Sequence, residues 1–252
     1  MSLVTYNLDT GGEGTTCTTA NTGCNVISLG AGSTAIFRAA AAAFGPYGVR
    51  INAAAGTSPV MRWPLAAANN QVSVQIATTA VKELTSGNAS YATFFSLRHS
   101  SGTVCSLQYV CDDAGIGKRI RFIAGASGAV IGELLTSGVS PVTQYWYTII
   151  VNNSTGNYSV KMYDAGRNLV GSISGIYGSF NTAPFTHVQA GSGWAAFAST
   201  QDIDHVQADD GSATEISLPP VPPEEVHSDM YVLTNVEWSA SPPVVWDGAD
   251  WR

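Results

Sequence analysis

Short stretches in which apolar and polar residues alternate recur along this chain of 252 residues, and they constrain its fold more than any other feature. In "QVSVQIA", the alternation puts Val72, Val74 and Ile76 on one face of an extended strand and polar residues on the other. Turn-forming clusters such as "TSGN", "NNSTGN" and "DAGRN" separate such stretches. About fifteen strand candidates precede the proline-rich part of the chain, which is the pattern of an all-β sandwich.

Two other stretches sharpen this prediction. "NYSVKMYD" places Tyr158, Val160 and Met162 on one face, whereas "YWYTIIVN" from Tyr145 is almost continuously apolar. A continuous apolar run indicates a central strand that is covered on both faces. Residues 34–43 are rich in alanine, which favours a helix, but "GPYG" follows at once and strands flank them, so we assign no helix.

Composition argues against several classes of protein. The net charge is −7 and only 12% of the residues are charged, so we expect no binding to a nucleic-acid backbone. The basic cluster Lys118, Arg119 and Arg121 falls on a strand, where the two arginines share the polar face. No apolar run approaches the length of a membrane span and no signal peptide is recognised, so we expect neither membrane insertion nor signal-directed secretion.

The four cysteines fall into two pairs. Cys105 and Cys111 stand on one face of the strand "TVCSLQYVC". They lie roughly 20 Å apart along extended chain, too far for a disulfide, so we expect core thiols. Cys17 and Cys24 flank the turn "TTANTG", which can bring them together, so a disulfide there is left open. No Cys-x-x-Cys occurs, which argues against a zinc site.

The composition changes after Ile216. The stretch "SLPPVPPEEVHSD" is rich in proline and favours extended polyproline II, a semi-rigid spacer. We therefore predict a β-sandwich over 1–216, a proline-rich linker over 217–228 and a C-terminal aromatic segment over 229–252.

The C-terminal segment is predicted to act in assembly. It contains Trp238, Trp246 and Trp251, and its Asp-Gly pair predicts a tight turn between two aromatic arms. Because a two-stranded hairpin is marginal alone in water, it must pack on something. The proline spacer favours docking on another protein or another copy, and the alternative is that the tryptophans fold back over the sandwich.

Several stretches resemble one known class of domain. They are "CTTANTG", "AFGPYGVRINAA", "YWYTIIVNN", "YSVKMYDAGRNLVGSISG" and "DIDHVQADDG". The chain is similar to the concanavalin A-like, laminin-G-like jelly rolls, and more narrowly to copies in minor tail and other virion proteins of tailed bacteriophages. This resemblance covers most of 1–216 and implies a jelly-roll sandwich of two antiparallel sheets. The stretch "VVWDGADWR" resembles the Trp-Asp-Gly-x-x-Trp endings of phage structural proteins.

Some members of this fold are glycosidases with a Glu-x-Asp-x-Glu strand, whose alternate carboxyl groups share one face. The nearest match here is Asp202, Asp204 and Val206, which lacks the third carboxyl group. We therefore expect no hydrolase. The resemblance implies instead that the aspartate of "IDHV" pins a turn as its strand closes the sandwich.

Metal and proton-transfer sites are not evident in the sequence. Four histidines are scattered along the chain, and we assign none of them a catalytic role: His99, His187, His205 and His227. The family allows calcium, which needs several converging carboxylate and carbonyl oxygens. Two acidic pairs are candidates, Asp112 with Asp113 and Asp209 with Asp210. Aspartate is also a common turn residue, so we name no metal site and no cofactor.

The family also allows a carbohydrate surface. Sugar sites combine exposed aromatic rings with polar groups, because one sugar face is apolar while the hydroxyl groups need hydrogen bonds. Trp194 in "GSGW" and Tyr177 and Phe180 in "GIYGSFN" are expected at loop edges, and we predict them as ligand-binding residues. Trp63 and Trp146 are expected in the core.

Together these observations favour a non-enzymatic component of a tailed-phage virion. It would be a minor tail or surface-decorating protein, made in the host cytoplasm, with its jelly roll displayed outward for host attachment. The expected partners are other virion proteins and, as a further hypothesis, a host cell-surface glycan, and a homo-oligomer is left open. The alternative is a carbohydrate-binding module of a secreted bacterial protein, and a glycoside hydrolase is less favoured.

Overall fold

The computed structural model describes residues 2–6, 8–80, 90–111, 119–125, 128–135, 140, 142–178, 180, 183–191 and 198–221. These residues form fifteen strands, in agreement with the alternation, and two short helical turns, α1 (Thr19–Thr22) and η1 (Ala39–Ala41). Every strand pairing among them is antiparallel. No helix among the described residues is both long and apolar enough to cross a membrane.

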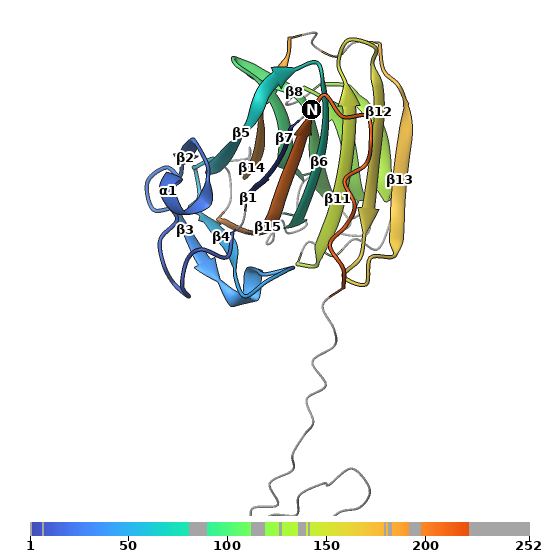
Figure 1. Cartoon of the computed structure of the whole chain (residues 1–252). Coiled ribbons are helices and arrows are strands. Elements are labelled where there is room, and N and C mark those ends of the chain that lie inside the picture. Colours follow the sequence, from blue (N-terminus) through green and yellow to red (C-terminus); the bar gives the residue numbers. More distant parts are fainter. Residues whose placement is uncertain are drawn as a thin grey trace, which may run out of the picture. The chain divides into compact units, whose positions relative to one another are not determined.

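Eight strands form the first sheet, called sheet A here (Figure 1). Seven of them follow in the order β13 (Leu169–Ile176), β12 (Asn157–Tyr163), β11 (Gln144–Asn152), β6 (Gln71–Thr79), β15 (Ser199–Asp210), β4 (Gly48–Ala53) and β3 (Thr34–Arg38). The remaining strand, β1 (Ser2–Tyr6), pairs with the second half of β15, and β4 pairs with the first half. The start of the described chain is thereby fixed to its last strand.

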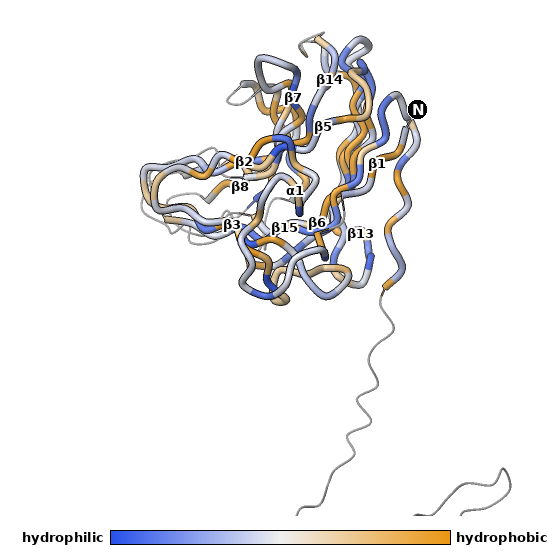
Figure 2. The backbone as a smooth tube through the Cα atoms, turned by 60° about the vertical axis from the view of Figure 1, so that its left-hand side comes forward, coloured by the Kyte–Doolittle hydropathy of each residue, from blue (hydrophilic) through white to orange (hydrophobic). Residues whose placement is uncertain are grey.

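Seven strands form the second sheet, called sheet B. Their order is β10 (Val130–Leu135), β9 (Arg119–Ala124), β8 (Gly102–Cys111), β7 (Ser90–His99), β14 (Phe185–Gly191), β5 (Val60–Asn69) and β2 (Val26–Ser28). Strands far apart in sequence therefore become neighbours, because β14 lies between β7 and β5. Figure 2 shows hydrophobic and hydrophilic residues alternating along the strands, as a sandwich with one inner and one outer face per sheet requires.

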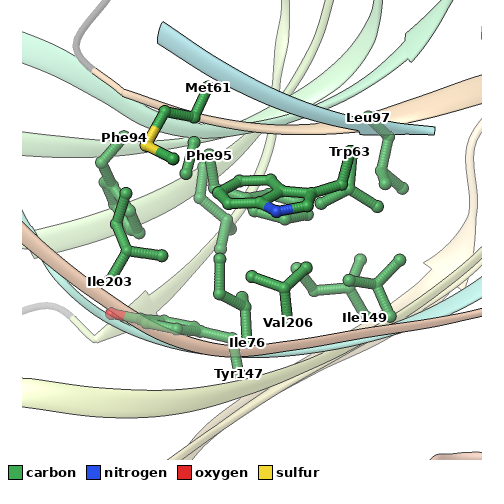
Figure 3. Close-up of a cluster of buried hydrophobic side chains, with 14 of the residues drawn as sticks. Met61, Trp63, Ile76, Phe94, Phe95, Leu97, Tyr147, Ile149, Ile203 and Val206 are labelled. Carbon is green, nitrogen blue, oxygen red and sulfur yellow. The ribbon is translucent and has the colours of Figure 1, made fainter. Parts of the chain in front are cut away.

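The core fills the space between the two sheets. Figure 3 shows side chains from both sheets meeting there, among them Trp63 and Leu97 from sheet B and Tyr147 and Ile149 from sheet A. Trp63 is fully buried, as predicted, and its indole Nε1 donates a hydrogen bond of 3.0 Å to the carbonyl oxygen of Thr22. Burial of each large apolar side chain contributes roughly 1.5–3 kcal/mol, so this layer supplies most of the stability.

The alternation assigned core residues correctly in β6. Val72, Val74 and Ile76 are fully buried and belong to one hydrophobic cluster. The intervening Ser73 and Gln75 face outward but are fully buried as well, which the alternation did not predict. A segment that follows β15 covers them.

This segment, residues 211–219, is called the strap, and it runs beside β11 and β12 over the outer face of sheet A (Figure 1). Gln75 Nε2 donates to the carbonyl oxygen of Ile216 at 3.0 Å, and Arg167 Nε donates to that of Pro219 at 3.1 Å. The Arg167 guanidinium also lies 4.1 Å from the ring centre of Trp146. Trp146 is buried as predicted, but on the outer face of sheet A, opposite the core residue Tyr147.

Glu215 is the main polar contact of the strap. It accepts hydrogen bonds from Thr148 Oγ1 at 2.7 Å and from the Tyr163 hydroxyl at 2.6 Å, and it pairs with Lys161. Burial raises the pKa of Glu215, but its bonds to Lys161, Tyr163 and Thr148 outweigh burial and lower the pKa below its ordinary value. The strap is therefore held to β11 and β12 through one carboxylate.

The described residues up to Val221 form one unit. Pro219 of the strap accepts a hydrogen bond from Arg167 in the turn between β12 and β13, whereas the predicted linker starts at residue 217. Residues from 222 onward lie outside the described residues. The boundaries of the linker and of the segment 229–252 stay a prediction.

The turn between Cys17 and Cys24 is the short helix α1, which the sequence did not predict. Thr18 caps it: its Oγ1 accepts a hydrogen bond from the Asn21 backbone N–H, and Asn21 Oδ1 accepts one from the Thr18 N–H. The disulfide left open by the sequence is absent, because both thiols are free and buried. Burial raises the pKa of each of these thiols to about 12.

Two other local predictions hold in the structure. Cys105, Leu107 and Tyr109 share the inner face of β8 and are fully buried, whereas the side chain of Cys111 lies outside the described residues. The alanine-rich residues 34–43 form strand β3 followed by the single turn η1, so no longer helix occurs there.

Candidate functional site

The outer face of sheet B carries the candidate site. Trp63 and Leu97 point into the core (Figure 3), so Arg62 and Arg98, their neighbours in sequence, point to the outer face. Both arginines are partly exposed. They stand on β5 and β7, and His187 of β14 lies on the strand between them.

The pairing register brings these side chains together. His187 faces Arg98 across β14 and β7, and Gln189 faces Arg62 across β14 and β5. Residues that face each other in this way have Cβ atoms about 4.5–5.5 Å apart. Gln189 Oε1 accepts a hydrogen bond of 2.7 Å from Arg62 Nε, and on its other side Gln189 faces Ser96. Arg62, Arg98 and His187 are called the cationic cluster below.

Burial and the charges of neighbouring arginines lower the pKa values of Arg98 and His187. Burial lowers the pKa of Arg98, and the charge of Arg62 lowers it further. Burial also lowers the pKa of His187, and both arginines add to that shift. His187 Nε2 lies 2.8 Å from the Asn25 side-chain nitrogen, which only donates, so the imidazole accepts there and carries its proton on Nδ1, 2.8 Å from Thr186 Oγ1.

More polar groups continue this face over β8, β9 and β10. Arg121 Nε donates to Gln108 Oε1 at 2.9 Å, and its guanidinium lies 5.3 Å from the ring centre of Tyr91. Arg119 forms an ion pair of 3.2 Å with Glu133. Arg119 and Arg121 thus share the polar face of their strand, as predicted.

The two sheets differ in charge. The strands of sheet B contain four arginines and one acidic residue, Glu133. The strands of sheet A contain three lysine or arginine residues and four aspartates. Within the described part of the chain, no carboxylate pairs with Arg62 or Arg98. Sheet B is therefore a basic region in a chain whose net charge is −7.

The first aspartate of β15 has a structural partner. Asp202 is almost fully buried and accepts hydrogen bonds from Arg50 Nε at 2.7 Å and from Arg50 Nη2 at 2.9 Å. After Asp204 the strand bulges, with His205 at a φ of 48°, and Val206 turns into the core. Residues 202, 204 and 206 therefore do not share one face, which the simple alternation had assumed.

Asp204 pins a turn, as the resemblance implied. Its Oδ2 accepts hydrogen bonds of 2.8 Å from the backbone N–H groups of Ala43 and Phe44, and Oδ1 accepts one of 2.7 Å from His205. Burial raises the pKa of Asp204 to about 7, although these three bonds favour the ionised form. A small pocket of about 120 Å³ adjoins it, lined by Thr5, Asp9, Phe44, Asp204 and His205.

The predicted loop aromatics that the structure describes pack on one another. The ring centre of Phe180 lies 5.0 Å from that of Tyr177 and 6.3 Å from that of Phe122. Phe180 is only 6% exposed, so the expectation of an exposed ring is wrong for this residue, because its ring joins the core. Tyr177 is half-buried in the same cluster. Ligand binding by these residues stays a prediction.

Asp210, the second member of the acidic pair at the end of β15, serves the fold. Asp210 accepts hydrogen bonds from the backbone N–H groups of Ser2 at 2.8 Å and Ala67 at 2.7 Å, which ties β1 and β5 to β15. In the part of the chain that the structure describes, no three His, Cys, Asp or Glu side chains are grouped to hold a metal ion. Calcium binding stays untested.

Several residues singled out in the sequence lie outside the described residues. They are Asp112, Asp113, Lys118, Trp194, His227, Trp238, Trp246 and Trp251. The predicted roles of Trp194 in ligand binding and of the three C-terminal tryptophans in docking therefore stay predictions.

No family model and no curated protein matches this sequence. Many solved structures match its fold. The cellulose-induced protein Cip1 has a TM-score of 0.52 and 11% identity, over 77% of this chain and 93% of Cip1. An endo-β-1,4-glucuronan lyase from the fungus Trichoderma reesei has a TM-score of 0.51 and 9% identity, over 75% of this chain and 91% of the lyase.

A carbohydrate-binding module, CBM2, of the evolved Dit protein of Lactobacillus casei BL23 phage J-1 also matches. Its TM-score is 0.43 and its identity 11%, over 82% of this chain and 88% of the module. Plant lectins are among the matches as well. The two antiparallel sheets and the matches to Cip1 and the glucuronan lyase show an all-β sandwich of the concanavalin A-like type, which confirms the predicted fold class. At these identities the likeness is one of fold.

Proposed function

We propose that this jelly roll is a non-enzymatic carbohydrate-binding module and that it serves as an adhesion component of a tailed-phage virion. The observation that supports carbohydrate binding best is the outer face of sheet B, where Arg62, Gln189, Arg98 and His187 stand in adjoining cross-strand rows. Sugar recognition needs several fixed polar groups, because each hydroxyl group exchanges water for a protein partner. Strands hold such groups more firmly than loops do.

The non-enzymatic part of the proposal is supported by the state of the β15 carboxylates. A retaining glycosidase needs two available carboxyl groups about 5–5.5 Å apart. Asp202 accepts hydrogen bonds from Arg50 Nε and Nη2, and Asp204 accepts three backbone hydrogen bonds. Both carboxyl groups are thus engaged in hydrogen bonds that hold the fold. Among the structural neighbours, the glucuronan lyase acts on a polysaccharide. From that comparison we propose for this chain the recognition of a polysaccharide, but not its cleavage.

The virion part of the proposal rests on the sequence resemblance to tailed-phage proteins, including the stretch "VVWDGADWR". Trp238, Trp246 and Trp251 would then attach the chain to other virion proteins. Mass spectrometry of purified particles of a tailed phage that encodes this chain tests the assignment. Replacement of all three tryptophans by alanine should prevent incorporation, whereas presence of the chain in culture medium and not in particles would favour a secreted bacterial module.

Carbohydrate binding is tested on a glycan array with the full chain. Gln189→Ala should weaken binding at least tenfold, because it removes a fixed acceptor and frees the Arg62 guanidinium to move. Asn52→Ala is the matched control: Asn52 stands on sheet A and bonds to Thr34 through its amide, so its loss should leave binding unchanged. A double variant, Tyr177→Ala with Trp194→Ala, tests the predicted loop aromatics. Reducing-sugar release by the wild type would contradict the non-enzymatic proposal.

A further inference from the structure

We propose that the glycan bound by the outer face of sheet B is acidic, with its carboxylate or phosphate groups held between Arg62 and Arg98. This inference rests on the proposed function and narrows it to one class of ligand. It starts from the partners of the two guanidinium groups.

Among the described residues, Arg62 and Arg98 donate side-chain hydrogen bonds to neutral oxygen atoms. Arg62 Nε donates to the Gln189 amide oxygen, and Arg98 Nη1 donates to Thr103 Oγ1 at 2.9 Å. A guanidinium carries five N–H donors, so each arginine keeps donors for another acceptor. A carboxylate or phosphate group presents two oxygen atoms that accept two such bonds side by side, which a sugar hydroxyl group does not.

The charges of the cluster are not neutralised by the strands that carry it. The strands β5, β7 and β14 contain no aspartate or glutamate. Burial and then the charge of Arg62 lower the pKa of Arg98, and burial and then the charges of both arginines lower the pKa of His187. Like charges held close together in partly buried positions oppose folding. An anionic ligand placed between the two guanidinium groups would be attracted to both and would offset their repulsion.

Neutral hydrogen-bonding groups surround the two arginines, which favours an acidic sugar over a bare anion. Gln189 lies opposite Arg62, and Thr103 lies opposite Arg98. Asn25 adds an amide beside His187. Hydroxyl and amide groups of this kind match sugar hydroxyl groups, while the guanidinium groups match the acid.

The test measures binding of the full chain to matched polymers by biolayer interferometry. Polygalacturonate and its fully methyl-esterified form share a backbone and differ in charge. Poly(glycerol phosphate) and polyglucuronate separate phosphate from carboxylate recognition, and inorganic polyphosphate supplies charge without sugar. We expect at least tenfold tighter binding to one or more of the acidic glycans than to the esterified polymer and to polyphosphate.

The variants Arg62→Gln and Arg98→Gln should each weaken that binding at least tenfold. Arg38→Gln is the control for net charge: it also removes one positive charge, but from β3 of sheet A, where Arg38 pairs with Glu13. It should leave binding unchanged. Arg62→Lys keeps the charge without the forked geometry and should fall between wild type and Arg62→Gln. The comparison of acidic and esterified polymers uses the wild type alone, so it stands even if a variant fails to fold.

The outcomes separate this inference from the proposed function. Equal binding of acidic and neutral glycans, with loss in Gln189→Ala, would overturn the acidic specificity and leave carbohydrate binding intact. If polyphosphate bound as tightly as any glycan, the claim that the ligand is a saccharide would be overturned, and with it the proposed function. Absence of binding to every acidic and neutral polymer would overturn both.

Discussion

The cationic side chains on the two outer faces of the sandwich have different kinds of partners. On sheet A, Arg50 is held by Asp202, and Lys161 is held by Glu215 of the strap. On sheet B, Arg62 and Arg98 bond to neutral oxygen atoms and repel each other. Sheet A is covered by a segment of its own chain, while the arginines of sheet B stay partly exposed. We therefore expect the charged pairs on sheet A to serve stability and the partly exposed Arg62 and Arg98 to serve ligand binding.

This difference can be tested, because substitutions on the two sheets should affect either the free energy of unfolding or glycan binding, but not both. Substitutions on sheet A should lower the free energy of unfolding and leave glycan binding by the folded protein unchanged. Substitutions in the cationic cluster should weaken glycan binding and leave the free energy of unfolding nearly unchanged.

The largest effect on stability is expected for Asp204→Ala. Asp204 is 2% exposed, and its loss leaves the backbone N–H groups of Ala43, Phe44 and His205 without their acceptor. Each unsatisfied buried group costs about 1–3 kcal/mol, so we expect a loss of at least about 3 kcal/mol in urea denaturation. A loss below about 1 kcal/mol would show that water replaces the carboxylate and that Asp204 does not pin the turn.

The same aspartate predicts a pH dependence. Burial raises its folded-state pKa from the ordinary 3.8 to about 7. A raised pKa means that the folded state binds the proton more tightly, so this contribution to stability is full below about pH 4 and is lost as the pH rises through 7. Asp204→Asn should flatten the decline in stability between pH 4 and 7. An unchanged slope would contradict the titration of Asp204 in this range.

A smaller loss is expected for Glu215→Ala, which releases the strap. The variant removes the acceptor of Thr148 and Tyr163 and the partner of Lys161 at a partly exposed site, so we expect about 1–2 kcal/mol. Because the folded-state pKa of Glu215 is lowered, its contribution is present above pH 4.5 and is lost as the pH falls. Hydrogen exchange should rise in residues 211–219, whereas Glu13→Ala, at an exposed pair, should leave it unchanged.

Much of the fold could be predicted from the sequence because its determinants are local. The alternation in β6 and β12 identified core residues, and the aspartate of "IDHV" was expected to pin a turn. The bulge at His205 was missed, because a single residue at positive φ leaves no pattern in the sequence. The strap was missed as well, because residues 211–219 neither alternate nor contain a helix signal.

The cationic cluster was missed for a different reason. Arg62, Arg98 and His187 are separated by 36 and 89 positions in the sequence, and they meet only because β14 pairs with both β5 and β7. A signal was present, since "VMRWPL", "SLRHS" and "THVQA" place basic residues at the polar positions of strands without acidic ones. Only knowledge of the strand order in sheet B would have shown that these three strands are neighbours. The loop aromatics were selected because their rings were expected to be exposed. Exposure of a loop side chain cannot be read from the sequence, and Phe180 is buried in the core.

The fourth prediction concerns the stability of the cluster variants. Arg62→Gln and Arg98→Gln each remove one of two charges that repel, so we expect a change of the free energy of unfolding within about 0.5 kcal/mol. Arg50→Gln on sheet A should cost more, because it leaves the buried Asp202 without its partner. Thermal denaturation of the three variants side by side measures the contrast. A loss above about 2 kcal/mol in Arg62→Gln would mean that this arginine is part of the framework.

The smallest effect is expected from His187 and depends on pH. Its pKa lies below the ordinary 6.5 because of burial and the charges of Arg62 and Arg98, the two charged groups that act on it. An acidic glycan between the arginines offsets these charges and should raise the pKa of His187, which NMR titration of the imidazole measures with and without ligand. By linkage, affinity should then rise as the pH falls from 7.5 to 5.5, by less than the roughly tenfold that one full pKa unit would bring. His187→Gln should remove this pH dependence while retaining binding. An imidazole pKa that is the same with and without bound acidic glycan would place the acid away from Arg62 and Arg98, even if both arginines prove necessary for binding.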